Sequence, residues 1–368
     1  MATEFASLTG APSAVAAPNI IKGSKSPPPL LDTFSKPAAP PIAIKKACLI
    51  YNPVSGGRKG KKFAETVVAP MFQAAGVQLE LLPTQRVGHA VEMAANHDLT
   101  GVDALCALGG DGTLGDVLSG FLSRSAEKRG STVLGFIPGG TGNTVMHDVL
   151  GYRPRMNGAA VKAAVDAILA GHTRDVDCSR LECVGNDGQQ FSRHTINIVT
   201  CGLGVDANAA AEKRRWMGPL RYDFSIITEI LKIGCRKTPR CTLKVDGKAS
   251  QLELFVLTIM NNKHSGTGLR LSPFAQMDDG RIDIMYTPKA INSILTALKL
   301  DGMIKSKGKH VNHKLVEYAT ASSTIELTCE GAPQRVMMDG DIIGFTPAKM
   351  TVIPAAFKLL TPEQSGAC

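Results

Sequence analysis

Short apolar runs, each followed by a glycine-rich turn and then by helical periodicity, recur three times in the first half of the chain. The runs span residues 47–51, 102–108 and 132–137. After the second run, apolar residues within 114–122 recur at the spacing of one helical face. Strand, glycine turn and helix in series predict a parallel sheet with helices on both faces, whose ligands bind at the carboxyl ends of the strands.

The pattern shortens to an alternation of apolar and polar residues after about residue 172. Segments 191–201 and 323–341 have this period, and 241–257 predicts two strands around a hairpin turn at Asp246-Gly247. One helical insertion is expected near 209–232. The second half is therefore predicted to be mainly antiparallel.

These two patterns divide the chain into two domains. An α/β domain, with a parallel sheet and helices on both faces, is expected at 45–172, followed by a mainly antiparallel β-sandwich domain at 173–345. The apolar segment at about 346–361 is expected to return to the first domain. Residues 1–44 are rich in Ala, Pro and Ser and predict a disordered tail, because such a composition buries little apolar surface.

The amino-acid composition limits the kinds of ligand and macromolecule that the protein is expected to bind. The formal net charge of +9 suits phosphorylated ligands, anionic membranes or nucleic acid, but aromatic residues are only 5% of the chain, so no stacking surface for nucleic acid is expected. The nine cysteines are widely spread without a C-x-x-C pair, and they predict reduced core thiols instead of disulfides or a zinc site. No apolar run approaches the roughly 20 residues of a membrane span, and no secretory signal is evident.

The glycine turns and one aspartate carry the candidate chemistry. In "PGGTGN", residues 138–143, the glycines let backbone N–H groups face phosphate oxygens, and Thr141 and Asn143 add side-chain hydrogen bonds. The lysines of 59–62 are candidate counter-charges. Asp111, in "GGDGT", adds a negative charge that an anion site does not need. It is predicted to accept the proton of an attacking hydroxyl, or to hold Mg²⁺, in phosphoryl transfer.

Three further motifs leave alternatives open. Asp339 and Asp341, in "MDGD", are hard oxygen ligands suited to Mg²⁺ or a ribose contact, or else exposed acids of a hairpin turn. The stretch "CGLGVDA" matches a dinucleotide fingerprint, but it lies in the antiparallel half, which does not favour a nicotinamide site. His310 and His313 form either a metal pair without a third ligand, or part of a solvated basic segment, 305–314, that touches anionic lipid head groups.

The motifs "YNPVSGG", "GGDGT" and "PGGTGN", in this order and spacing, resemble the lipid kinase superfamily of diacylglycerol kinases and sphingosine kinases. The resemblance covers about residues 46–360. It implies an N-terminal ATP-binding domain, a C-terminal lipid-binding β-sandwich and an active site between them, with Asp111 as the catalytic base. The nucleotide contacts that it implies are Asn52, Ser55, Gly56, Gly57, Thr84, Gly109, Gly110, Gly112, Thr113, Gly139, Gly140, Thr141, Gly142 and Asn143.

The resemblance extends to two later stretches. Asp339, Gly340 and Asp341 resemble a "DGE" motif that lies near the nucleotide and its magnesium, which implies Asp341 as the metal ligand. Arg215 and Arg221, in "RRWMGPLR", resemble two arginines that reach the nucleotide phosphates in sphingoid-base kinases.

The identity of the lipid depends on residues just before that stretch. Asn208 stands where sphingoid-base kinases have an aspartate that pairs with the substrate amine, and an amide cannot supply that charge. Asp206 is its expected replacement. The stretch "GTGLRLSPFAQMDDGRIDI" resembles bacterial-type diacylglycerol kinases instead.

We therefore expect an ATP-dependent, Mg²⁺-requiring lipid kinase that phosphorylates a hydroxyl of a sphingoid long-chain base, with diacylglycerol or another glycerolipid as the alternative acceptor. A catalytically silent sensor of lipid or nucleotide, and an NAD kinase, are the other hypotheses. A cytoplasmic location with transient, peripheral membrane contact is expected, because the substrate lies in a bilayer. No nucleic-acid partner is expected, and the oligomeric state stays open.

Overall fold

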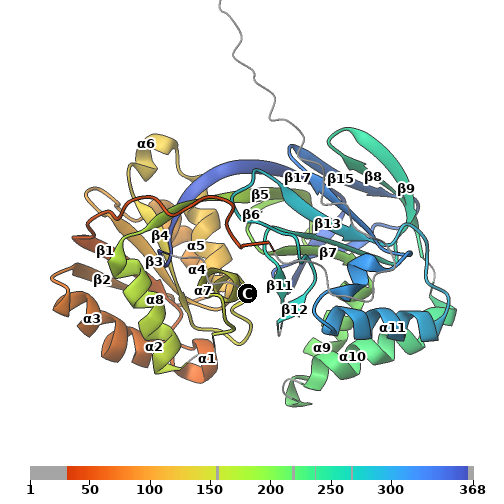
Figure 1. Cartoon of the computed structure of the whole chain (residues 1–368), viewed down its shortest axis with the longest axis horizontal. Helices are drawn as coiled ribbons and strands as arrows, with labels where there is room; N and C mark the ends of the chain where they lie inside the picture. The colour runs from red at the N-terminus through yellow and green to blue at the C-terminus, as the bar shows by residue number, and fades with distance from the viewer. Residues whose placement is uncertain (1–30, 155–156, 218–219, 237, 267, 364–368) are drawn as a thin grey trace, which may run out of the picture.

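The protein consists of two domains side by side (Figure 1). The computed structural model describes residues 31–154, 157–217, 220–236, 238–266 and 268–363. None of the helices in these residues combines the length and the apolar character needed to cross a bilayer.

The first domain is built on four parallel strands, in the spatial order β4-β3-β1-β2. They are β1 (Lys46–Tyr51), β2 (Gln78–Pro83), β3 (Ala104–Gly109) and β4 (Val133–Pro138). The central strands β3 and β4 are buried along their whole length, which explains their uninterrupted apolar sequences. The expected parallel sheet is confirmed. The helices of this domain are α1 (Ser55–Arg58), α2 (Gly60–Phe63), the π-helical turn η1 (Ala64–Val68), α3 (Ala69–Ala74), α4 (His89–Asn96), α5 (Asp111–Ser123), α6 (Ala126–Arg129), α7 (Thr144–Leu150) and α8 (Gly158–Ala170).

The second domain is mainly antiparallel, as expected, and the Asp246-Gly247 turn joins two paired strands. The strands are β5 (Thr173–Gly185), β6 (Gln190–Thr195), β7 (Ile198–Gly202), β8 (Arg240–Val245), β9 (Lys248–Glu253), β10 (Val256–Met260), β11 (His264–Ser265), β12 (Leu269–Arg270), β13 (Ile282–Tyr286), β14 (Glu317–Ala321), β15 (Thr324–Cys329), β16 (Arg335–Met338) and β17 (Asp341–Leu360). In the described part of this domain, three longer helices and three 3₁₀ turns accompany them: α9 (Leu203–Glu212), η2 (Arg215–Met217), α10 (Leu220–Leu231), η3 (Ile233–Cys235), α11 (Ile294–Lys305) and η4 (Lys309–Asn312).

The long strand β17 connects the two domains. It pairs with β16, β15 and β5 in the second domain, and near its end Leu359 pairs in parallel with Leu134 of β4. Strand β17 thus brings the chain back to the sheet of the first domain. Because β17 joins the strands of both domains into one continuous sheet, it fixes the carboxyl edge of the first domain opposite the second domain (Figure 1).

Two expectations are wrong. The tail was expected to extend to residue 44, but Thr33 and Phe34 are only 1% and 4% exposed, and Ala39 pairs with Thr173; residues 1–30 lie outside the described part. Disulfides were not expected, but Cys241 and Cys329, on the paired strands β8 and β15, form one. Neighbouring strands bring these cysteines together although 88 residues separate them, so their spacing in the sequence carries no signal.

Candidate functional site

All four motif loops of the first domain meet at one edge of its sheet, at the carboxyl ends of β1 to β4. Backbone hydrogen bonds join neighbouring loops and strands: Asn52 N donates to Leu108 O at 3.2 Å, and Thr84 N donates to Tyr51 O at 2.9 Å. The structure therefore brings the predicted nucleotide positions together.

The loops after β3 and β4 pack glycine against glycine. Gly139 N donates to Gly109 O at 2.6 Å. A Cβ on Gly140 would lie 2.4 Å from the Cα of Gly110, closer than any side chain can come. The two loops thus present bare backbone at this edge, which suits close approach by phosphate oxygens.

The loop after β1 has an unusual backbone. Gly56, Gly57 and Arg58 have successive φ angles of 55°, 73° and 66°, a region that favours glycine. The Ser55 hydroxyl donates to Asn52 O at 2.9 Å. The Ser55 hydroxyl therefore stabilises the loop itself, and the backbone at the exposed Gly57 stays accessible to a ligand.

Asn143 does not face a ligand. Its side chain is fully buried, with φ at 51°, and its amide donates to Gly140 O and to Pro154 O, both at 2.9 Å. Its Oδ1 accepts from Gly140 N at 2.8 Å. The expectation of a side-chain contact to phosphate is wrong for this residue, which instead shapes the loop around the exposed Thr141.

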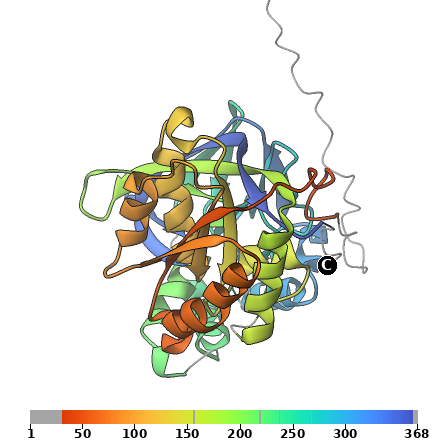
Figure 2. The ribbon, with the colours of Figure 1, turned by 90° about the vertical axis from the view of Figure 1, so that its left-hand side faces the viewer.

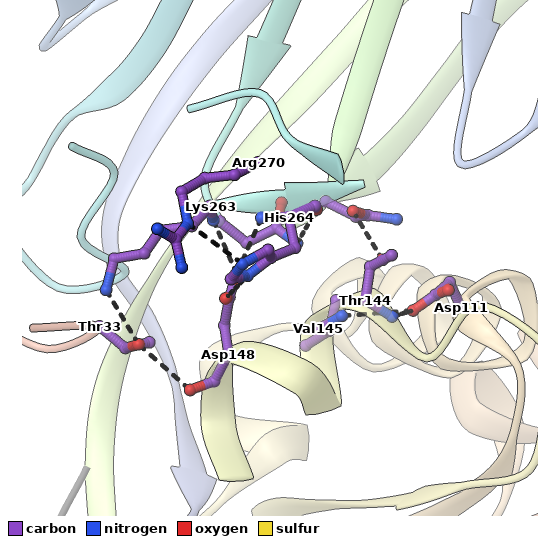
Figure 3. A network of polar contacts seen from close by, with 10 residues as sticks. Thr33, Asp111, Thr144, Val145, Asp148, Lys263, His264 and Arg270 are labelled. Atoms are coloured by element: carbon purple, nitrogen blue, oxygen red, sulfur yellow. Dashed lines mark hydrogen bonds and ion pairs between the residues drawn. The ribbon is translucent and has the colours of Figure 1, made fainter. Parts of the chain in front are cut away.

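Asp111 begins α5 and lies against the amino end of α7. Its Oδ1 accepts from Thr144 N at 2.8 Å and from Val145 N at 3.4 Å (Figure 3). Burial raises the pKa of Asp111 above its ordinary value, and these hydrogen bonds oppose the rise. The close approach of Gly142, where a Cβ would lie 2.8 Å from Asp111 Oδ2, seats this carboxylate between the two glycine loops.

Asp339 faces the same place from the second domain. It lies in the turn between β16 and β17 with φ at 54°, and its Oδ1 accepts from the Thr195 hydroxyl at 3.0 Å. Burial raises the pKa of Asp339 to about 7, and the charge of Asp111 adds to the rise. A Cβ on Gly115 of α5 would lie 3.0 Å from Asp339 Oδ2. Asp111 and Asp339 therefore form a pair of electrostatically coupled carboxylates across the domain boundary.

Asp341 was the expected metal ligand, but Asp339 is the aspartate of this motif that points inward. Asp341 is exposed at the start of β17 and does not line the cavity described below. The motif is a turn, but the alternative of exposed acids holds only for Asp341, because Asp339 is half-buried and lies near Asp111.

A chain of hydrogen bonds joins the two carboxylates. Thr144, whose N–H binds Asp111, donates its hydroxyl to Asn197 Oδ1 at 3.1 Å, and Asn197 N donates to Thr195 Oγ at 3.0 Å. Thr195 in turn donates to Asp339. Thr195 and Asn197 were missed by the sequence analysis; their only signal is that they are polar residues beside the apolar strand that follows.

A second buried network holds the other end of α7 (Figure 3). Asp148 is fully buried and accepts from Lys263 N at 2.6 Å, and its carboxylate also contacts the His264 ring. Lys263 Nζ donates to Thr33 Oγ at 3.2 Å. The polar run "NNKH" directly after β10 is the sequence signal for this network, since polar side chains that are buried need hydrogen-bond partners.

A cavity of about 420 Å³ leads from the two carboxylates into the second domain. Its polar end includes Asp111, Asp339, Thr144 and Asn197. The remainder is mostly apolar and is lined mainly by β-strands and by α9, α10 and α11, including Leu203, Ile226, Ile230, Phe255, Met285, Leu300, Ile304 and Val316. The cavity suits an apolar chain with a polar group at the carboxylate end.

Asp206 is not free to recognise an amine, contrary to expectation. Its carboxylate forms ion pairs with Arg236 and Arg335, and it does not line the cavity. Asn208 does line the cavity, and its amide donates to Gly340 O at 2.7 Å. Asn208, which by resemblance stands where sphingoid-base kinases have an acid, is thus neutral.

Two other candidate residues, Arg221 and His310, contact protein groups outside the expected roles. Arg221, in α10, donates to the Tyr222 hydroxyl at 2.9 Å and to Glu212 at 3.4 Å; the side chain of Arg215 lies outside the described residues. His310 is buried and its Nε2 lies 3.1 Å from Leu271 O, so it belongs neither to a solvated segment nor to a metal pair with His313.

Two domain models match the chain. A diacylglycerol kinase catalytic domain matches residues 46–181, and a YegS C-terminal NAD kinase beta sandwich-like domain matches residues 197–361. A diacylglycerol kinase of Staphylococcus saprophyticus is 27% identical over 87% of this chain and 96% of its own length. Sphingosine kinase 2 of Arabidopsis thaliana is 26% identical over 78% of this chain, which spans 64% of that relative's length.

The fold agrees with these matches. A crystal structure of a diacylglycerol kinase from Bacillus anthracis superposes with a TM-score of 0.63 over 86% of this chain and 97% of that one, at 23% identity. The catalytic-domain match and the relatives that are named kinases make the protein a phosphotransferase with a kinase catalytic domain. It belongs to the lipid kinase superfamily that contains the diacylglycerol kinases and the sphingosine kinases.

The raised pKa of Asp339 predicts a pH-dependent effect of the substitution Asp339→Asn. Since the native state binds this proton more tightly than the unfolded state, the free energy of unfolding falls as pH rises from the ordinary value, 3.8, through about 7. An amide has no proton to lose, so the variant should gain stability relative to the native chain over that window, on the order of 1.4 kcal/mol for each unit of pKa shift.

Urea unfolding of both chains in a metal chelator, between about pH 5 and pH 8, measures the difference. Asp166→Asn, on the exposed side of α8, is the control and should leave the pH profile unchanged. If the free energy of unfolding of the native chain and of Asp339→Asn changed with pH in the same way, the pKa of Asp339 would not be raised in the native state.

Proposed function

We propose that the protein transfers the γ-phosphoryl group of ATP to the hydroxyl of a lipid whose apolar chain lies in the cavity. The cavity carries this proposal, because it joins the carboxylate pair to a largely apolar space. A second nucleotide, which an NAD kinase would have to hold, needs polar partners that this apolar lining does not offer.

The residues around the carboxylate pair have defined parts in this reaction. Backbone N–H groups of the glycine loops bind the ATP phosphates, and the exposed Thr141 hydroxyl adds a donor. Asp111 accepts the proton of the lipid hydroxyl as that oxygen attacks the γ-phosphorus and ADP leaves. The hydrogen bonds from α7 hold this carboxylate in position before the substrate arrives.

The pair also fits Mg²⁺. Carboxylate oxygens are the hard donors that this ion prefers. The negative charges of Asp111 and Asp339 disfavour each other, and a bound cation would relieve that repulsion. Asp111 and Asp339 are the residues that would hold it. The ion supplies charge neutralisation at the phosphates.

Asp111→Asn should abolish turnover while leaving the affinity for ATP, measured without Mg²⁺, within a few fold. An amide keeps the shape of the carboxylate but cannot accept the hydroxyl proton, a contribution of about 10²- to 10⁴-fold. Label transfer from ATP to lipid micelles measures turnover, and equilibrium dialysis with labelled ATP measures binding. Asp166→Asn is the matched control for charge, and turnover retained in Asp111→Asn would remove Asp111 from the mechanism.

We further propose that the lipid head group is neutral, as in a diacylglycerol, instead of bearing the amine of a sphingoid base. The carboxylate of Asp206 is neutralised by two arginines, and the amide of Asn208 carries no charge. Two further acids line the cavity, Asp223 and Asp301, and both form ion pairs with Lys305, so neither is left to receive an ammonium group. This reverses the preference for a sphingoid base that the sequence suggested.

Asn208→Asp should therefore raise the activity on sphingosine relative to diacylglycerol. One charge-assisted hydrogen bond to the ammonium is expected to change the ratio of kcat/KM values about tenfold, which corresponds to ~1.4 kcal/mol. Asn292→Asp, on the exposed connection before α11, adds the same charge away from the cavity and should leave the ratio unchanged. A native chain that prefers sphingosine would contradict the neutral head group without affecting the kinase assignment.

The outer face of α10 is proposed to rest on the bilayer from which the lipid enters. Tyr222, Ile226 and Ile230 line the cavity, whereas Leu220, Ile227 and Leu231 are 69%, 40% and 58% exposed on the same helix. An exposed apolar face on a helix whose other face lines the lipid site is unusual for a surface helix. Trp216, 84% exposed just before α10, extends this face.

Replacing Leu220, Ile227 and Leu231 together by serine should release the protein from phosphatidylcholine vesicles in a sedimentation assay, because less apolar surface then enters the bilayer. Activity on a short-chain diacylglycerol dissolved as monomers should stay close to that of the native chain, since none of the three lines the cavity. Val87→Ser, at a 98% exposed position in the first domain, is the control. Equal sedimentation of all three proteins would place the membrane contact elsewhere.

A further inference from the structure

Three side chains with metal-binding atoms converge at the outer edge of the first domain. Cys48 lies in β1, Glu80 in the edge strand β2, and His97 directly after α4. Figure 2 turns this side of the molecule, with β1 and β2 in red to orange, toward the viewer. None of the three is among the described residues that line the cavity, so this cluster is independent of the proposed function.

The distances within the cluster match a tetrahedral zinc site. Cys48 Sγ lies 3.6 Å from His97 Nε2 and 3.7 Å from Glu80 Oε2, and the last two atoms are 3.1 Å apart. Zinc bonds of ~2.3 Å to sulfur and ~2.0 Å to nitrogen and oxygen place tetrahedral ligands ~3.3 to ~3.6 Å from one another. The three atoms already have the spacing of three corners around one ion.

The exposure of the cluster leaves a path for an ion and a fourth ligand. Cys48 is fully buried, whereas the side chains of His97 and Glu80 are 24% and 49% exposed. A single ring nitrogen of His97 faces both the thiol and the carboxylate. One ion between these atoms satisfies all three groups, and water completes the tetrahedron on the solvent side.

The histidine is held in place by the neighbouring helix. Arg124, directly after α5, donates from Nε to Ala94 O at 2.7 Å and also contacts His97 O. These bonds fix the end of α4, from which the imidazole extends toward β1 and β2.

We propose that Cys48, Glu80 and His97 bind one zinc ion, with water as the fourth ligand. As the Zn–S bond forms, the thiol releases its proton to solvent, while the carboxylate and the neutral imidazole bind without change of protonation. The ion joins two strands and a helix, and so stabilises the native state. The lack of a C-x-x-C pair does not exclude such a site, because its ligands come from three separate elements.

The test uses the full-length chain without a histidine tag. Addition of Co²⁺ should give one equivalent of bound metal with the thiolate-to-metal and visible bands of tetrahedral coordination, and Zn²⁺ should displace it and raise Tm. Cys48→Ser should remove the thiolate band. Glu80→Gln, at a half-exposed side chain that cannot disturb the core, should weaken zinc binding by at least about 10- to 100-fold.

Cys106→Ser removes another fully buried thiol, from the adjacent strand β3, and should leave both cobalt bands intact. A native chain that binds no cobalt, or a thiolate band that survives in Cys48→Ser, overturns the proposal. Unchanged zinc affinity in Glu80→Gln also overturns it, because the carboxylate is then not a ligand. If Cys48→Ser fails to fold, Glu80→Gln and His97→Gln decide the question by zinc affinity.

Discussion

The contact between Asp111 and the amino end of α7 is the interaction on which the rest of the site depends. A carboxylate at the start of one helix accepts hydrogen bonds from the first N–H groups of the next helix, which locks the loops after β3 and β4 together. The same Thr144 that donates its N–H to Asp111 binds Asn197 of the second domain through its hydroxyl. One residue thus sets both the position of the Asp111 carboxylate, the proposed catalytic base, and the position of the second domain.

The repulsion between Asp111 and Asp339 explains why several hydrogen-bond donors are needed to hold the two carboxylates. Asp111 and Asp339 come from different domains and raise the cost of each other's charge. Their positions are stable because Thr195 and the amino end of α7 supply donors, and because glycine at 115 and 142 leaves room for the carboxylates. The site is therefore assembled by the domain boundary, and neither domain contains it alone.

The parallel sheet, the return of the last strand and the clustering of the glycine loops could all be predicted from the sequence. Each depends on local patterns: apolar runs, helical periodicity and turns that only glycine can make. Helix α11 was missed because its interior contains Gly302 and only Ala297 and Leu300 are buried. Its pattern therefore lacks the strong apolar stripe of a core helix.

The details of the site required the three-dimensional structure, because they arise from contacts between distant residues. The choice of Asp339 over Asp341 depends on which way a turn faces, and the neutralisation of Asp206 depends on Arg236 and Arg335. The role of Asn143 follows from the carbonyls that its loop brings near it. The spacing of residues in the sequence does not determine the direction in which such side chains point.

The passage of β17 through both domains also constrains how the chain is made. During synthesis from the N-terminus, the first domain can assemble β1 to β4 early, but Leu359, which pairs with Leu134 of β4, follows the whole second domain in the chain. Until then one side of β4 presents unpaired N–H and C=O groups, the kind of edge that recruits strands from other chains. The nascent protein must therefore hold an open sheet edge through the synthesis of the whole second domain, and removal of the end of β17 would leave that edge open permanently.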